Sequence, residues 1–417
     1  MRLRIHRGTK EIGGTCIEVE AQGKRLVLDV GLPLDAPDDV AAQESLLPNV
    51  SGFRDPDDSL LGVVVSHSHM DHYGLARHIG QNVPVWIGKD AHTVMKAASR
   101  YVHKGYAFTD PHFITHRTPV EIGPFQVTPY LVDHSAFDAY AVLIESDGRR
   151  VFYSGDFRGH GRKARLFEKM IENPPDGIDV LLMEGTTVGR AETGRGVQTE
   201  DDLEHQFAHA FEKTKGMHFV WTSSQNIDRL VTIFRAAKRN GRLLLIDLYT
   251  AVVLEATGRD TIPQSNWQNV RLYIPQRQRV FIKNRKLFND LGRHEANRVY
   301  PEDLPGLAGQ AVMLFRPMAM SDGGIKASLD GAALTYSMWE GYLERESSRK
   351  VLNWLKDHGI SWQTIHTSGH ASVDNLQQFA SALAPRSLVP IHSFEPDRFG
   401  DLFDHVACRD DGVWWEV

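Results

Sequence analysis

Four side chains of the kind that bind metal ions stand within six positions, directly after an apolar run. Residues 63–72 read Val-Val-Val-Ser-His-Ser-His-Met-Asp-His. The β-branched residues predict a buried strand, and the chain is expected to turn where the histidines begin. Imidazole and carboxylate are the ligands of catalytic zinc sites, in which a water holds an open position. We therefore predict that His67 and His69 ligate one ion, and that Asp71 and His72 reach a second.

Three later apolar runs also end in a candidate ligand or acid. Residues 127–135 end in Val-Asp-His-Ser, residues 150–158 end in Ser-Gly-Asp-Phe-Arg, and residues 180–187 end in Met-Glu-Gly-Thr-Thr. These segments supply His134, Asp156 and Glu184. A carboxylate has two oxygens and can bridge two cations, so Asp156 is the candidate bridging ligand, and Gly155 before it permits close backbone approach. Most of the other histidines are interpreted as ordinary surface or core residues.

The order of these motifs resembles the signature of the metallo-β-lactamase superfamily: His-x-His-x-Asp-His, then a strand ending in His, then a strand ending in Gly-Asp. This resemblance implies an α/β (α+β) fold, a four-layer αββα sandwich with one or two metals at the sheet edges. It also implies that Asp29, at the end of the apolar residues 26–30, supports the histidine loop by hydrogen bonding. Asp138 stands in His-Ser-x-x-Asp, which is similar to a loop of nucleic-acid-processing members. It is expected either to support the site or to be a turn residue.

Length and composition limit the class of protein. The chain has 417 residues, 41% of them hydrophobic, which is more typical of two domains than of one. Its two cysteines, Cys16 and Cys408, lie far apart. A disulfide framework or a cysteine zinc site is therefore not expected, and a reducing cytoplasmic location is. There is no secretory signal pattern and no run of about 18 apolar residues, so no membrane association is expected.

A second α/β pattern follows Glu184 where a small hydrolase would continue to its last ligand. It begins with a helical pattern at 200–213, a strand at 218–222, a helix at 228–239 and a strand at 243–247. We expect a first part of the sandwich at 1–197, an inserted domain at 198–346, and the second part of the sandwich at 347–417.

An inserted domain at this place resembles the β-CASP group of metallo-β-lactamase nucleases, which includes ribonuclease J, the eukaryotic pre-mRNA 3′-end endonuclease and DNA crosslink-repair nucleases. The group carries an acid after the sandwich strand and two histidines beyond the insert. Glu184 matches the acid, and residues 366–370, His-Thr-Ser-Gly-His, look most like ribonuclease J. Residues 389–395 supply His392. The chain ends soon after His392, so we expect it to lack the C-terminal domain of ribonuclease J. The sequence leaves the oligomeric state open.

The resemblance and the chemistry of the residues imply two Zn²⁺ per chain, although Mn²⁺ is compatible with the same ligand atoms. One ion is assigned to His67, His69, His134 and Asp156, and the other to Asp71, His72, Asp156 and His392. Two such ions activate a water and clamp a phosphate. His370, left free of metal, is the expected general acid, with Glu184 orienting its imidazole and raising its pKa, while Asp71 can also accept a proton from the water.

Two polar segments are candidates for binding phosphate. His366, Ser368 and the backbone amide of Gly369 form one of them. A simple helix start is the alternative interpretation of that turn. Ser223 and Ser224 precede a predicted helix, whose N-terminus can bind an anion.

The insert contains a basic stretch that bears on the substrate. Residues 271–298 hold eight basic residues against Asp290 and Glu295, with aromatic residues between them. Such a stretch either follows a phosphate backbone and stacks bases, or is a solvated helix face. The net charge of −6 does not exclude a local basic groove.

The hypothesis is a zinc-dependent nuclease of the β-CASP type that cleaves single-stranded RNA and leaves a 5′ phosphate, with exonuclease and endonuclease action both open. A DNA nuclease would share every catalytic residue. A hydrolase of small esters, thioesters or lactones would need no basic insert, and a catalytically silent binding protein is the alternative that is not an enzyme.

Overall fold

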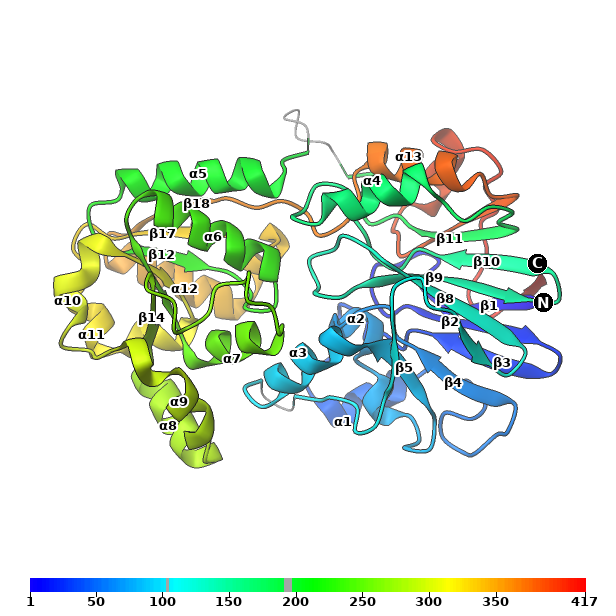
Figure 1. Cartoon of the computed structure of the whole chain (residues 1–417), viewed down its shortest axis with the longest axis horizontal. Helices are drawn as coiled ribbons and strands as arrows, with labels where there is room; N and C mark the ends of the chain where they lie inside the picture. The colour runs from blue at the N-terminus through cyan, green and yellow to red at the C-terminus, as the bar shows by residue number, and fades with distance from the viewer. Residues whose placement is uncertain (103–104, 191–196) are drawn as a thin grey trace. The chain divides into compact units, whose positions relative to one another are not determined.

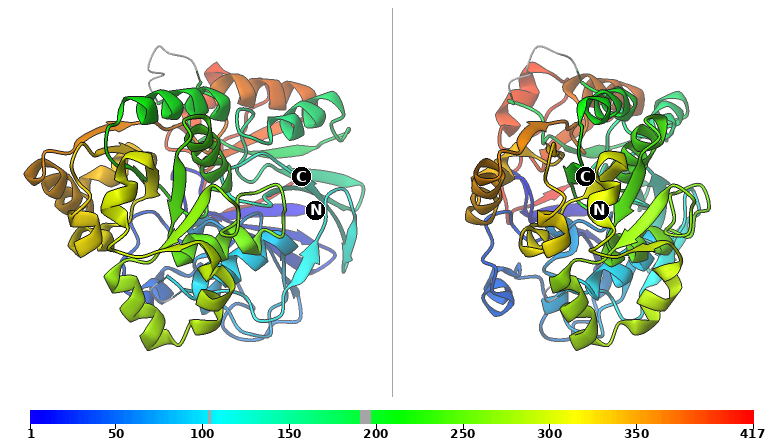
Figure 2. Two further views of the ribbon diagram at one scale, coloured as in Figure 1. Left: turned by 60° about the vertical axis from the view of Figure 1, so that its left-hand side comes forward. Right: turned by 90° about the vertical axis from the view of Figure 1, so that its left-hand side faces the viewer.

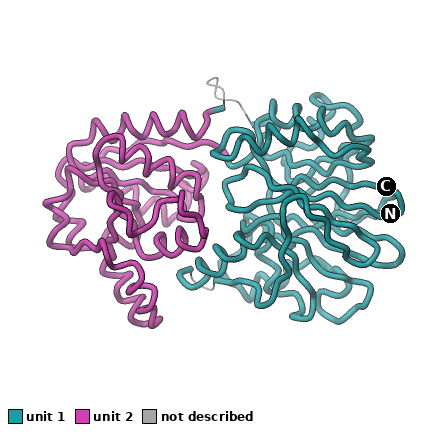
Figure 3. Tube along the Cα trace, viewed as in Figure 1, with its two compact units in different colours: residues 1–197, 369–417 teal, residues 198–368 magenta. Residues whose placement is uncertain are grey.

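The computed structural model describes residues 1–102, 105–190 and 197–417. The chain divides into two compact units (Figure 3): unit 1 comprises residues 1–197 and 369–417, and unit 2 comprises residues 198–368. Unit 1 is thus built from both ends of the chain, with unit 2 inserted between them.

Unit 1 contains two sheets. The first has the strand order β20 (Trp414–Glu416), β1 (Arg2–Arg7), β2 (Cys16–Ala21), β3 (Lys24–Leu28), β4 (Leu60–Val64), β5 (Val85–Gly88) and β6 (His112–Ile114). The second has the order β19 (Ser387–Ile391), β11 (Val180–Glu184), β10 (Arg149–Tyr153), β9 (Tyr140–Ser146), β8 (Phe125–Leu131) and β7 (Val120–Ile122). The helices of this unit are α1 (Val40–Gln43), α2 (Met70–Tyr73), α3 (Lys89–Ser99), α4 (Ala164–Glu172) and α13 (Val373–Leu383).

Three apolar clusters define the layers of unit 1. One fills the space between the two sheets, where Ile17 of β2 and Val142 of β9 belong to the same buried cluster. A second joins the first sheet to α3 through Met95, and a third joins the second sheet to α4 and α13 through Phe167 and Phe379. Helix, sheet, sheet and helix therefore follow one another (Figures 1 and 2), which confirms the predicted sandwich.

Unit 2 is a parallel α/β domain. Its sheet has the order β15 (Arg298–Val299), β14 (Val270–Tyr273), β13 (Leu243–Ile246), β16 (Ala311–Leu314), β12 (His218–Trp221), β17 (Ala333–Tyr336) and β18 (Ser361–Thr364), and all neighbours are parallel. Its helices are α5 (Glu200–Lys213), α6 (Ile227–Arg239), α7 (Leu248–Ala256), α8 (Gln276–Arg285), α9 (Phe288–His294), α10 (Leu304–Leu307), α11 (Gly323–Lys326) and α12 (Glu346–Asp357). The first of them, α5, starts with a capping box between Thr199 and Asp202.

The division between the units differs from the sequence-based boundary at 346/347. Helix α12 and strand β18 lie in unit 2, because β18 pairs with β17 and because Val351 and Leu355 of α12 pack in the core of that unit. The return to unit 1 therefore comes at residue 369.

Parallel pairing explains how distant segments deliver side chains to one place. β10, β11 and β19 are parallel neighbours, and so are β3 and β4. Parallel strands end at the same edge of a sheet, and ligand sites form beyond their carboxyl ends. Asp156, Glu184 and His392 follow or end the first three strands, and Asp29 and His67 follow the other two.

Within the described ranges, none of the helices combines the length and the apolar character needed to cross a bilayer.

A buried charge network lies on β1, β2 and β3. Glu18 is fully buried and accepts hydrogen bonds from Arg4 Nη2 at 2.7 Å and Arg25 Nη1 at 2.6 Å, and its Oε2 lies 2.8 Å from His6 Nε2. Burial alone would raise the pKa of Glu18, but the hydrogen bonds from His6, Arg4 and Arg25 outweigh it and lower this pKa to about 2.

Because the pKa of Glu18 is lower in the folded protein than the ordinary value of 4.5, its ionised form stabilises the fold above pH 4.5, and this contribution is lost as the pH falls toward 2. We expect Glu18→Gln to reduce the free energy of unfolding by roughly 3 kcal/mol at pH 7, and by much less at pH 3. Urea unfolding of both proteins at the two pH values measures this. An equal difference at both would contradict the ion network.

Candidate active site

Three histidines form the first candidate metal group. The ligand nitrogens of His67, His69 and His134 lie within 4.8 Å of one another, and His134 Nε2 is 3.1 Å from His69 Nδ1. Burial lowers the pKa of each of these histidines below the ordinary value. Their imidazoles are therefore neutral at pH 7, which is the form that binds a cation.

Asp71, His72, Asp156 and His392 form the second group, with ligand atoms again within 4.8 Å. Asp156 Oδ2 lies at the centre of the site, 3.1 Å from His72 Nε2, 3.8 Å from His67 Nε2 and 4.0 Å from His392 Nε2. Burial alone would raise the pKa of Asp156, but the surrounding imidazoles lower it well below the ordinary value. Asp156 therefore faces imidazoles of both candidate groups.

Unpaired polar atoms indicate that cations fit this site. Several buried side-chain atoms of the described residues have no hydrogen-bond partner, and they include three atoms of candidate ligands: His67 Nε2, His392 Nε2 and Asp156 Oδ1. Burying such atoms without a partner is costly, and native proteins rarely do so. All three belong to the two groups of candidate ligands. Nitrogen and carboxylate donors in this number suit Zn²⁺ or Mn²⁺.

Asp29 supports the histidine loop. Its Oδ2 accepts a hydrogen bond from His72 Nδ1 at 2.7 Å and another from the hydroxyl of Tyr153, and its Oδ1 accepts one from the backbone N–H of Ser66 at 2.7 Å. The Nε2 atom of His72 is thereby directed toward the second group. Asp29 and His392 both have a positive φ, 59° and 50°, a strained backbone that is typical of functional sites.

Two further partners of the ligands escaped the sequence-based interpretation. His134 Nδ1 donates to the backbone carbonyl of Gly369 at 2.6 Å, and His392 Nδ1 lies 2.9 Å from the hydroxyl of Thr15. These contacts orient two candidate ligands from remote parts of the chain. A Cβ at Gly369 would lie 2.5 Å from Ser135 Oγ, so the glycine permits a close approach that a larger residue would obstruct. Neither a lone threonine nor a backbone carbonyl leaves a signal in the sequence.

His370 and Glu184 form a pair beside the two groups. His370 Nδ1 is 3.1 Å from Glu184 Oε2 and 3.5 Å from Asp156 Oδ2. Burial opposes the charged imidazole, but Glu184 and Asp156 raise the pKa of His370 to about 9. In this arrangement His370 carries a proton at neutral pH. Its Nδ1 faces Glu184, and this contact fixes the orientation of the ring.

A buried ion pair ties together the segments that carry His134 and Asp156. Asp133 Oδ1 accepts from Arg158 Nε at 3.3 Å, Asp133 Oδ2 accepts from the backbone N–H of Gly161 at 2.7 Å, and both charged side chains are fully buried. Each member of the pair lies within two residues of a candidate ligand. The pair therefore fixes the separation of these two ligands.

Asp138 caps the N-terminus of helix α3. Its Oδ2 accepts from the backbone N–H groups of Asp90 and Ala91 at 2.9 and 3.1 Å, at the start of α3. Its positive φ of 60° is that of a turn residue, which was one of the two expectations for it.

The other candidate phosphate-binding side chains lie in unit 2. Ser224 is buried, and its hydroxyl is 2.7 Å from Thr250 Oγ1 and accepts from Arg316. Ser223 is exposed, and its Oγ accepts from the backbone N–H of Gln225. His366 and Ser368 belong to the same unit, and His366 Nδ1 is 3.4 Å from Arg229 Nη1. Gly369 belongs to unit 1, as do the candidate metal ligands.

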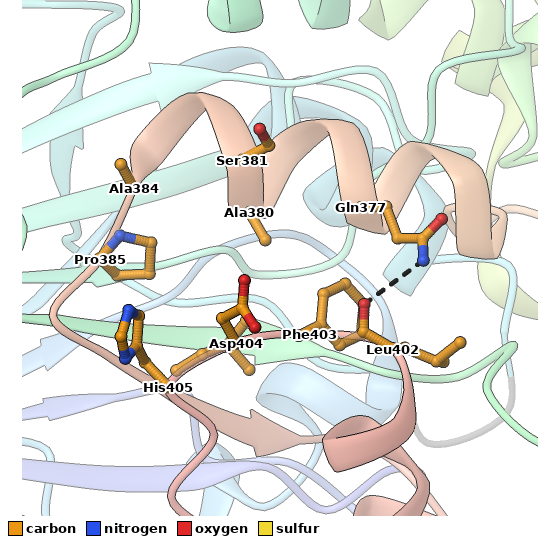
Figure 4. Close-up of a pocket in the computed structure, with 10 residues that line it drawn as sticks. Gln377, Ala380, Ser381, Ala384, Pro385, Leu402, Phe403, Asp404 and His405 are labelled. Carbon is orange, nitrogen blue, oxygen red and sulfur yellow. Dashed lines mark hydrogen bonds between the residues drawn. The ribbon is translucent and has the colours of Figure 1, made fainter.

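A cavity of about 380 Å³ lies between α13 and residues 402–405 of unit 1. Figure 4 shows its lining side chains, with Gln377 Nε2 donating to the carbonyl of Leu402 at 3.3 Å. None of the candidate ligands lines it. The cavity is thus separate from the metal groups.

Comparison with known protein families gives a match to the beta-lactamase superfamily domain over residues 32–244. Among solved structures, a protein of unknown function from Enterococcus faecalis V583 superposes with a TM-score of 0.81 at 19% sequence identity, covering 99% of each chain. At this identity the likeness concerns the fold.

Curated relatives include ribonuclease J proteins. Ribonuclease J of Helicobacter pylori strain B128 is 22% identical over 413 residues, which cover 96% of this chain and 56% of that protein. Ribonuclease J 2 of Streptococcus pyogenes serotype M3 is 20% identical over 415 residues, covering 97% of this chain and 71% of that protein. The chain thus spans little more than half the length of the Helicobacter relative. The resemblance inferred from the motifs is confirmed.

Proposed function

The chain belongs to the beta-lactamase superfamily, and we propose that it is a metal-dependent hydrolase that cleaves phosphodiester bonds of RNA. The observation that carries this proposal is the convergence of two ligand groups on Asp156, beside the His370–Glu184 pair. The similarity to ribonuclease J proteins supports RNA as the substrate class.

We assign the two cations to the two groups. His67, His69, His134 and Asp156 would hold one, and Asp71, His72, Asp156 and His392 would hold the other. Zn²⁺ is the ion we propose, and Mn²⁺ fits the same donors. Such a pair of cations supplies, when bound, an activated water and a counter-charge for the phosphate.

The chemical step follows from the protein groups. The oxygen of a water forms a bond to phosphorus while the bond between phosphorus and the 3′ oxygen breaks. Asp71 accepts a proton from the water, and His370 Nε2 gives a proton to the departing 3′ oxygen. Glu184 holds His370 in the required orientation and tautomer. The products are a 5′ phosphate and a 3′ hydroxyl.

We further propose that the backbone amide of Gly369 and the side chains of His366, Ser368 and Ser223 bind substrate phosphates. Hydroxyl, imidazole and amide donors suit phosphate oxygens. Ser224 is left out, because its hydroxyl is buried and already bonded to Thr250 and Arg316.

Removal of the metal tests this function. Exhaustive dialysis against a chelator is expected to reduce hydrolysis of end-labelled single-stranded RNA at least about 100-fold, because the cations supply several kcal/mol of transition-state stabilisation. About two equivalents of Zn²⁺ or Mn²⁺ per chain should restore it.

Single-stranded DNA of the same sequence and p-nitrophenyl acetate serve as the matched substrates. Equal hydrolysis of DNA would broaden the substrate class to both polymers. Hydrolysis of the ester alone, or full RNA cleavage by the chelated protein, would contradict the proposal.

A further inference from the structure

One stretch of unit 2 is strongly basic, although the chain as a whole carries a net charge of −6. Residues 276–289, which we call the basic arm, contain no acidic residue and five basic residues, namely Arg277, Arg279, Lys283, Arg285 and Lys286. The basic arm comprises α8, the turn that follows it and the first two residues of α9. Helices α8 and α9 project from the rest of unit 2 in all views (Figures 1 and 2).

Four of the five cations are exposed, the exception being Arg279, whose Nη2 donates to Gln276 Oε1 at 2.7 Å. Within the described ranges, none of these four forms an ion pair with a carboxylate. The nearest acid in sequence, Asp290, is buried and pairs with Arg293 at 3.0 Å. The positive charge of the basic arm is therefore not neutralised by the protein itself.

The attachment of α8 to unit 2 does not require these cations. Gln278 and Ile282, one turn apart, are the buried residues of the helix. Gln278 Oε1 accepts from the backbone N–H of Leu248, and its Nε2 donates to Asp247. The opposite face, with Arg277 and Lys283, is left to solvent.

Exposed apolar side chains accompany the charge. Val280 and Phe288 are 50% and 56% exposed, and the guanidinium of Arg285 lies over the ring of Phe281 at 5.6 Å. Cations interspersed with aromatic faces are the composition of surfaces that bind single-stranded nucleic acid, since the cations follow the phosphates and the rings stack on bases. Two isolated apolar side chains are too few for a stable protein interface or for insertion into a bilayer surface.

We propose that the basic arm binds the phosphate backbone of single-stranded RNA and holds a part of the substrate outside the catalytic centre. This inference rests on the proposed function for the identity of the polymer. Each phosphate contact changes the slope of log K against log salt by about 0.7 for a single strand, so four cations contribute up to about 3 to that slope.

The test compares two variants of the full chain that lose the same charge. The arm variant carries Arg277→Gln, Lys283→Gln, Arg285→Gln and Lys286→Gln. The control variant loses four exposed lysines elsewhere in unit 2, by Lys213→Gln, Lys238→Gln, Lys326→Gln and Lys356→Gln. Fluorescence anisotropy gives the affinity for a labelled RNA of about 30 nucleotides over a series of salt concentrations. Cleavage assays give kcat/KM for this RNA and for one of about five nucleotides, which has too few phosphates for both the catalytic centre and the arm.

The arm variant is expected to bind the long RNA at least about tenfold more weakly and with a salt slope lower by about 2 to 3. Its preference for the long over the short RNA should fall at least about tenfold, while the control variant keeps the preference of the unchanged protein.

Equal affinity and salt slope of the two variants would overturn the inference. Binding to phosphatidylserine vesicles is measured for the same proteins. The inference would also be overturned if the arm variant lost binding to these vesicles but kept the RNA affinity of the unchanged protein. Failure of the unchanged protein to cleave either RNA would count against the proposed function, whereas the anisotropy measurements would still decide about the arm.

Discussion

Replacement of His370 with alanine is expected to slow RNA hydrolysis by about 10²- to 10⁴-fold, the usual contribution of a general acid. The physical reason is that the 3′ alkoxide is a poor leaving group unless it receives a proton as the bond to phosphorus breaks. Glu184 and Asp156 hold the pKa of His370 at about 9, against the opposing effect of burial, so the proton is present at neutral pH. The measurement is kcat for an end-labelled RNA.

A substrate with a better leaving group separates this role from a structural one. On the p-nitrophenyl ester of thymidine 5′-phosphate, whose leaving group needs no proton, His370→Ala should cost less than about tenfold. His209→Ala, at an exposed histidine of α5, is the matched control and should retain full activity on both substrates. An equal loss on RNA and on the p-nitrophenyl ester would contradict the assignment of His370 as general acid.

Asp156→Asn should lower activity by about 10³-fold or more, because the removed charge faces both ligand groups. Asp156 Oδ2 approaches His72, His67 and His392 at 3.1 to 4.0 Å, so the asparagine variant would lose the buried anion that is proposed to neutralise the two cations. Metal analysis after dialysis is expected to show fewer than two equivalents per chain, together with the loss of turnover.

The control for this substitution is Asp374→Asn, an isosteric change at an exposed carboxylate in the first turn of α13. It should leave both the metal content and kcat unchanged. Retention of two equivalents of metal and of full activity by Asp156→Asn would show that this carboxylate does not bridge the ions.

The order of the candidate ligands was predictable because each follows a short apolar strand. β4 ends at Val64, three residues before His67, and β10 ends at Tyr153, three residues before Asp156. Apolar runs and the side chains that end them are local features of a sequence, so their succession is readable without a structure. The mixed α/β fold and the superfamily are confirmed, and the structure brings the candidate ligands together.

The partners that orient these ligands were not predictable. Thr15 meets His392 across 377 positions, and His134 donates to a backbone carbonyl 235 positions away. Contacts of this kind depend on how two sheets pack and not on local periodicity. The C-terminal boundary of unit 2 was also not predictable from the sequence. It depends on the parallel pairing of β18 with β17, a long-range contact that a composition pattern does not encode.

The central claim is that this site directs water onto the phosphorus of an RNA phosphodiester, and isotope labelling tests it most directly. Metal-loaded protein is incubated with a defined single-stranded RNA in water enriched in ¹⁸O, and the masses of the products are measured by mass spectrometry. The account predicts a product with a 5′ phosphate that contains a single ¹⁸O and a partner that ends in an unlabelled 3′ hydroxyl. Intact RNA, or products that end in an unlabelled 2′,3′-cyclic phosphate, would contradict it.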